Sequence, residues 1–97
     1  METNFRCRGG EIDLIFRDGA YLVFAEVKYR SSGRFGEAAF SVGIKKQRTI
    51  CRVALFYMKY HGYTLETPVR FDVIAIDASS DGPVVVHWIK DAFMFRS

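Results

Sequence analysis

The spacing of apolar residues changes along the chain, and each change predicts an element. Residues 11–16 alternate polar and apolar side chains, and residues 21–28 are mostly apolar until their charged end. Asp18 and Gly19 lie between these segments, and Asp-Gly favours a tight turn. The pattern therefore predicts a β-hairpin in which Arg17 pairs with Ala20, and strict alternation places Ile12 and Ile15 on opposite faces.

A helical spacing follows the hairpin after a stretch, residues 31–42, whose glycines and lack of periodicity predict a loop. The helix is expected from Gly43 or Ile44 to about Tyr60, with Gly62 as its stop. Its apolar face carries Gln47, Ile50, Cys51, Ala54, Tyr57 and Met58. Residues 69–77 and 84–89 predict a second hairpin, so the order β-β-α-β-β indicates an α+β domain with a mixed sheet packed on one helix.

Length and composition fit one small domain covering residues 1–97. The chain is 49% apolar and 26% charged, which excludes a disordered protein. Its apolar runs are far shorter than a membrane-spanning helix, so no membrane association is expected. Cys7 and Cys51 have neither CxxC spacing nor a second pair, so we expect no disulfide framework or zinc site, and a cytoplasmic location.

The net charge of +3 hides a basic segment in the middle of the chain. No Asp or Glu occurs between Glu37 and Glu66. Its cations are Lys45, Lys46, Arg48, Arg52 and Lys59, and all of these except Lys46 form a stripe on the back of the expected helix. Such a stripe suits nucleic-acid phosphates, although many charged helix faces are simply solvated. Phe56 lies within the stripe, where it either stacks on a base or, as we favour, packs against a partner subunit.

A cluster of acids is predicted at the open end of the first hairpin. Alternation places Glu11, Asp13, Glu26 and Lys28 on one face of it. Both faces of this hairpin are rich in apolar residues, and buried carboxylates need cations, of which Lys28 supplies one. Mg²⁺ or Mn²⁺ suits such oxygen ligands, and the chemistry that follows is metal-assisted phosphodiester hydrolysis. The alternative is a surface hairpin with solvated cross-strand pairs.

Several separated motifs occur in the chain with a characteristic order and spacing. They are NFRCRGGEIDLI at 4–15, VFAEVKYRSS at 23–32, RFG at 34–36, KQR at 46–48 and RFDVIAI at 70–76. The chain thereby resembles the YraN-like family of bacterial proteins in the PD-(D/E)XK nuclease superfamily, which is similar to archaeal Holliday junction resolvases. The resemblance implies a restriction-endonuclease-like fold and a metal-dependent nuclease acting on DNA.

The resemblance also assigns roles to the acid cluster. It implies that Asp13 and Glu26 bind Mg²⁺ or Mn²⁺ and that Lys28 is the catalytic lysine. The backbone carbonyl of Val27 becomes a further metal ligand, and Glu11 an auxiliary one.

Residues outside that cluster complete the expected site. The resemblance places Gln47 beside the metal, the alternative being a buried amide with satisfied hydrogen bonds. Nucleic-acid phosphates are expected at Arg30, Arg34, Lys45, Lys46, Arg48 and Arg52. Asp72 and Asp77 are expected to be structural or solvated, and Trp88 to lie in the core.

Members of the resembled family begin with a further helix that packs on the sheet, and this helix is expected to be absent here. We therefore expect exposed apolar surface near the hairpin and a homodimer. A competing class is a non-catalytic nucleic-acid-binding or assembly subunit with the same fold. The intact set of Asp13, Glu26 and Lys28 favours the nuclease, whereas a purely structural protein would need no cationic helix.

Overall fold

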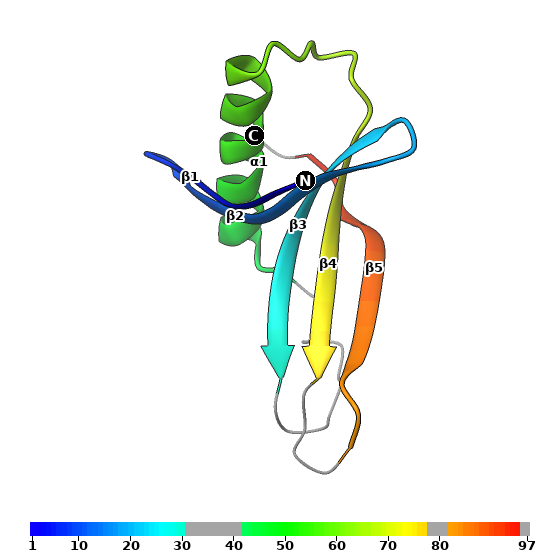
Figure 1. Cartoon of the computed structure of the whole chain (residues 1–97). Helices are drawn as coiled ribbons and strands as arrows, with labels where there is room; N and C mark the ends of the chain where they lie inside the picture. Colours follow the sequence, from blue (N-terminus) through cyan, green and yellow to red (C-terminus); the bar gives the residue numbers. More distant parts are fainter. Residues whose placement is uncertain (31–41, 78–81, 96–97) are drawn as a thin grey trace.

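The computed structural model describes residues 1–30, 42–77 and 82–95, except for the side chain of Arg30. The described residues form a mixed five-stranded sheet and one helix (Figure 1). The elements are β1 (Glu2–Cys7), β2 (Gly10–Asp18), β3 (Tyr21–Arg30), α1 (Ile44–Tyr60), β4 (Val69–Asp77) and β5 (Val85–Phe93). This is the predicted α+β architecture, and it is consistent with a restriction-endonuclease-like fold.

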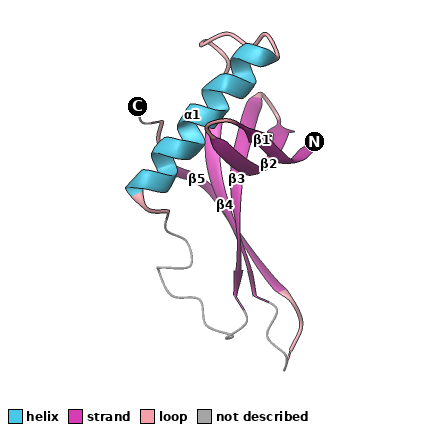
Figure 2. Ribbon diagram, turned by 90° about the vertical axis from the view of Figure 1, so that its left-hand side faces the viewer, coloured by secondary structure: helices cyan, strands magenta, loops and turns pink. Residues whose placement is uncertain are grey.

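The strands lie in the sheet in chain order, and β3 and β4 are its parallel pair. A parallel pair needs a long crossover, which here contains α1 and places the helix against one face of the sheet (Figures 1 and 2). The predicted bounds of the helix are confirmed. It ends where Gly62 adopts a φ of 76° and the Tyr63 N–H bonds to the Met58 carbonyl.

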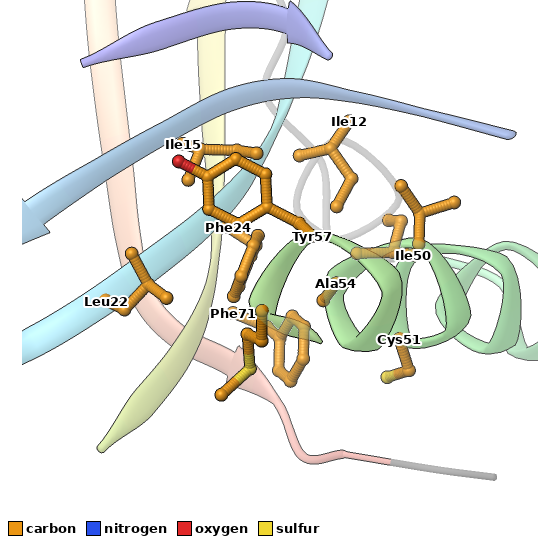
Figure 3. Close-up of a cluster of buried hydrophobic side chains, with 11 residues drawn as sticks. Ile12, Ile15, Leu22, Phe24, Ile50, Cys51, Ala54, Tyr57 and Phe71 are labelled. Carbon is orange, nitrogen blue, oxygen red and sulfur yellow. The ribbon is translucent and has the colours of Figure 1, made fainter. Parts of the chain in front are cut away.

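The apolar face of α1 packs against β2, β3 and β4 (Figure 3). Tyr57 stands at the centre of this core, with its ring edge-on to Phe5 at 5.0 Å and to Phe24 at 5.8 Å between ring centroids. Phe24 in turn stacks on Phe71. Each large apolar side chain buried in this way stabilises the fold by about 1.5–3 kcal/mol. The core therefore fixes the position of α1 over the strands that carry the acid cluster.

The β2–β3 hairpin is confirmed, but its predicted register is wrong. Asp18 pairs with Tyr21 and Leu14 with Ala25, so Gly19 and Ala20 form the turn. Gly19 has a φ of 62°, and a tight hairpin turn can take its positive φ at the first central residue, where glycine is favoured. The partners shift by an even number of residues, so the side chains of the paired segments, residues 14–18 and 21–25, keep their predicted faces.

β1 was not predicted, and it forms a second hairpin with β2 that lies close to α1 (Figure 2). Its tip approaches the helix at Gly10. A Cβ atom there would lie 2.7 Å from Thr49 Cγ2, and the φ of Gly10 is 146°. Only glycine fits this contact without strain.

Ile12 and Ile15 both point into the core, so the prediction that they lie on opposite faces is wrong (Figure 3). The alternation of β2 is broken between these two residues, where the β1–β2 ladder lacks the Asn4–Asp13 pair. The pairs Thr3–Leu14 and Phe5–Ile12 are regular, but between them Asn4 has a φ of 52°. Asparagine tolerates this left-handed conformation better than most residues.

Asp72 holds β4 and β5 together on the face away from α1. Its buried carboxylate accepts bonds from Arg70 Nε at 2.9 Å, Trp88 Nε1 at 2.7 Å and the Asp91 N–H at 2.9 Å. Asp72 is thus structural, as expected. Trp88 was expected in the core, yet it is 43% exposed, because its indole lies over the far face of the sheet to reach Asp72. Within the described ranges, no helix has the length and apolar character needed to cross a membrane.

Candidate functional site

Asp13 lies where β2 separates from β3. The β2–β3 pairs run from the turn as far as Leu14 and Ala25, and beyond them β2 continues paired with β1. The Val27 N–H donates instead to Asp13 Oδ2 at 2.8 Å. A side-chain carboxylate therefore satisfies a backbone donor at the end of the ladder, and this bond holds the carboxylate beside β3.

Glu26, next to Val27, shares this position. Its side chain is 14% exposed, and the Asp13 carboxylate is within hydrogen-bonding contact of its carboxyl group. Burial is the largest cause that raises the pKa of Glu26, from 4.5 to about 7, and the hydrogen bond and charge of Asp13 add to it. The predicted convergence of Asp13 and Glu26 is therefore present.

Lys46 is the cation that the structure brings to this acid pair. Its Nζ lies 3.5 Å from Glu26 Oε2, and its charge opposes the rise in the pKa of Glu26. Sequence reasoning placed Lys46 only among the phosphate contacts. The signal that could have found it is its position beside Gln47 in the first turn of a helix that covers the strand of Glu26.

Lys28 lies two residues after Glu26 in β3, so both side chains belong to the face of the sheet that α1 covers. It is half-buried and pairs in register with Ala75 of β4. The lysine is thus on the side of the acid pair, as predicted.

Glu11 is engaged elsewhere. It forms an ion pair with Arg6, its cross-strand neighbour in β1. Within residues 1–30, 42–77 and 82–95, no group of three or more His, Cys, Asp and Glu side chains is arranged to hold a metal ion. The acid pair alone still fits Mg²⁺, which commonly binds one or two carboxylates and keeps several waters. Two half-buried carboxylates in contact also need a cation more than isolated ones do.

Gln47 is buried, and its Nε2 donates to the Val42 carbonyl at 2.7 Å. This bond matches the alternative of a satisfied amide, and a role beside a metal stays a prediction. Lys45, Arg48 and Arg52 are exposed on the outer face of α1. The side chain of Arg30, and Arg34 as a whole, lie outside the described part of the chain.

The sequence is similar to a family of bacterial proteins. Residues 1–76 match the uncharacterised protein family UPF0102. A UPF0102 protein of Hahella chejuensis (strain KCTC 2396) is 50% identical over 93 residues, which cover 96% of this chain and 73% of the relative. One of Janthinobacterium sp. (strain Marseille) is 46% identical over 95% of this chain and 69% of its own length. A UPF0102 protein of Xanthomonas oryzae pv. oryzae (strain PXO99A) is 48% identical over 93% of this chain and 71% of its own length.

Proposed function

The chain belongs to the uncharacterised protein family UPF0102, the YraN-like group that its motifs indicated, and we propose that it is a metal-dependent nuclease acting on DNA. The observation that carries this proposal is the contact between the carboxyl groups of Asp13 and Glu26. Two acids are kept together in a partly buried position although burial, and then the contact itself, raise the pKa of one of them. Such perturbed pairs are common at functional sites.

Asp13 and Glu26 would each hold Mg²⁺ or Mn²⁺ through a carboxylate, with the Val27 carbonyl as a further ligand. The Val27 N–H keeps Asp13 in place for this task. When bound, the ion polarises a phosphoryl oxygen and lowers the pKa of a coordinated water. Asp13 and Glu26 must both be ionised to bind it, and Lys46 favours this state of Glu26.

Lys28 would assist the attack on phosphorus. It belongs to the same face of β3 as Glu26, and an ammonium group there orients the attacking water or stabilises negative charge on the phosphate. Lys45, Arg48 and Arg52 would bind neighbouring phosphates of the substrate, as would Arg30 and Arg34. Cleavage thus depends on the acid pair, whereas affinity depends on the cations.

A second candidate is a nucleic-acid-binding or assembly subunit without catalysis. The observation in its favour is that Glu11, expected as an auxiliary metal ligand, pairs with Arg6 instead. The acid pair of Asp13 and Glu26 therefore lacks this expected ligand. The cationic face of α1 supports this candidate as well as the nuclease.

The test uses fluorescently labelled four-way junctions, flaps and single strands with Mg²⁺ or Mn²⁺. We expect cleavage by the wild type and a loss of about 100-fold or more in Asp13→Asn and Glu26→Gln, with binding retained. Glu66→Gln, which removes an exposed acid far from the pair in sequence, is the matched control. If the wild type binds these DNAs but cuts none above the level of Asp13→Asn, the non-catalytic candidate replaces the nuclease.

A further inference from the structure

The outer surface of α1 continues onto the β1–β2 hairpin. A Cβ atom on Gly9 would lie 3.7 Å from Arg52 Nε, so this guanidinium group lies against the turn of the hairpin. Arg8 is exposed in the same turn. The hairpin, which the sequence did not reveal, therefore adds a cation to those of the helix.

Aromatic rings follow the cations along the helix. Phe56 and Tyr60 are 50% and 73% exposed, and their rings are nearly parallel, at 7° with centroids 6.1 Å apart. Phe5 of β1 lies beside them, 6.4 Å from Phe56. Residues 48, 52, 56 and 60 are spaced by one helical turn, so the two arginines and the two aromatic residues share one stripe.

The stripe begins close to the acid pair. Lys45 precedes Lys46, whose ammonium group contacts Glu26. From Lys45 to Tyr60 the helix rises about 22 Å, the length of about six nucleotides at the 3.4 Å spacing of a stacked strand. A strand lying on the stripe would therefore lead directly to the proposed metal site.

We propose that Arg8, Lys45, Arg48, Arg52, Phe56 and Tyr60 form a binding track for single-stranded nucleic acid. The cations bind phosphates and the two exposed rings stack on unpaired bases. Cations that follow a backbone, joined with aromatic platforms, are typical of single-strand binding, whereas bases inside a duplex offer no free faces to such rings. This inference rests on the proposed function and specifies its substrate, because a single strand or an unpaired flap bound to the track would reach Asp13 and Glu26.

Charge argues against a second copy of the chain on this surface. A symmetric dimer through the stripe would bring the same cations face to face, and the sequence has no acid between Glu37 and Glu66 to neutralise them. A polyanion matches this surface, and it accounts for both the cations and the exposed rings.

The test is fluorescence anisotropy with a labelled 15-nucleotide oligothymidylate and a duplex of the same length, in EDTA so that no metal-dependent cleavage occurs. We expect Phe56→Gln and Tyr60→Gln each to weaken single-strand binding about 5- to 50-fold and to leave duplex binding unchanged. Tyr60→Gln alters an exposed side chain, so it tests the proposal even if Phe56→Gln folds poorly.

The cations should respond differently to salt. The double variant Arg48→Gln/Arg52→Gln should flatten the salt dependence of single-strand affinity by about 1.4 in logarithmic slope, because each lost phosphate contact removes about 0.7. Phe56→Gln and Tyr60→Gln should leave this slope unchanged. Arg17→Gln removes an exposed cation of the β2–β3 hairpin and should alter neither measurement.

Two results would overturn the track: unchanged single-strand affinity in both aromatic variants, or an equal loss for duplex DNA. If these variants instead convert a dimer to a monomer without changing the affinity, the surface binds a second copy and the proposal is wrong. Asp13→Asn should bind the oligonucleotide like the wild type. If the track variants lose affinity but the wild type shows no metal-dependent cleavage, only the nuclease proposal is wrong. If the wild type cleaves DNA but the track variants bind it with normal affinity, only the track proposal is wrong.

Discussion

The Asp13 carboxylate accepts a 2.8 Å hydrogen bond from the Val27 N–H, next to the residue whose carboxyl group it contacts. One side chain thus ends the β2–β3 ladder and forms half of the acid pair. Structure and proposed function are coupled at this position, because a variant without an acceptor would leave the Val27 N–H unsatisfied. Asp13→Asn keeps an acceptor oxygen, and it is therefore the appropriate variant for functional tests.

The raised pKa of Glu26 predicts that the fold loses stability as pH rises. The folded state holds the Glu26 proton up to about pH 7, whereas the unfolded chain releases it near pH 4.5. The stabilising effect is complete below pH 4.5 and is lost between pH 4.5 and 7, at a cost of about 3 kcal/mol in the free energy of unfolding. Urea unfolding in EDTA at pH 5, 6, 7 and 8 measures this.

The contribution of Glu26 is the difference between wild type and Glu26→Gln at each pH. This difference should change across the interval from pH 5 to 7 and be constant above about pH 8. Glu66→Gln should follow the wild-type curve. Parallel curves for wild type and Glu26→Gln would mean that Glu26 titrates as a solvated acid.

Gly10→Ala should destabilise the protein by about 1–3 kcal/mol. The added Cβ atom would lie 2.7 Å from Thr49 Cγ2, and φ at this residue is 146°. Gly82→Ala is the matched control, because its Cβ atom meets nothing within 4 Å. Thr49→Ser in the Gly10→Ala background should recover part of the loss by removing the methyl group. Denaturant midpoints measure all three, and equal stability of the two alanine variants would contradict the close docking of the hairpin.

Asp72→Asn should destabilise the fold by about 2–4 kcal/mol at pH 7, because an amide cannot accept all the bonds that the buried carboxylate accepts. Burial alone would raise the pKa of Asp72, but bonds from Arg70, the Asp91 N–H and Trp88 outweigh it and lower that pKa below 3.8. The carboxylate's stabilisation is therefore present above pH 3.8 and is lost as pH falls through the lowered value.

The gap in stability between wild type and Asp72→Asn should accordingly shrink in acid, as measured by urea unfolding at pH 7 and pH 3. Trp88→Phe, which removes one donor and keeps an aromatic ring, should cost about 1 kcal/mol at pH 7. A gap that stays constant with pH would contradict the ionised network.

We also predict self-association through the face of the sheet opposite α1. Parallel strands such as β3 and β4 are usually covered on both faces, and this far face exposes Trp88 and Val86, the latter by 58%. Sedimentation at high micromolar concentration should detect a dimer, and Val86→Glu should shift it towards monomer. A monomeric wild type under these conditions would contradict the prediction.

The helix and four of the strands could be predicted from the sequence because their apolar spacing is regular. β1 could not, since its pattern is interrupted at Asn4, whose φ of 52° breaks the alternation. The hairpin register was shifted because Asp-Gly suggested the central turn pair, whereas Gly19 and Ala20 occupy it. Both differences depend on single backbone angles, which residue patterns describe poorly.

The part of the candidate site that depends on the alternation of side chains along β2 and β3 could be predicted from the sequence. Parity predicted that Asp13 and Glu26 share a face, and their carboxyl groups are in contact, although Asp13 lies beyond the last regular β2–β3 pair, Leu14–Ala25. The pairing of Lys46 with Glu26, and of Arg6 with Glu11, depends on how α1 and β1 pack on β2 and β3. Such contacts between distant segments are set by tertiary packing, and local spacing does not reveal them.

The most direct test of the metal site is calorimetric titration of the protein with Mn²⁺ at pH 6, in two buffers of different ionisation enthalpy. Glu26 is largely protonated at pH 6, so binding of one ion should release about one proton, and at pH 8.5 almost none. Asp13→Asn and Glu26→Gln should abolish binding, while Glu66→Gln should retain it. Mn²⁺ binding that persists unchanged in Glu26→Gln, or no binding by the wild type at either pH, would contradict a metal site at Asp13 and Glu26.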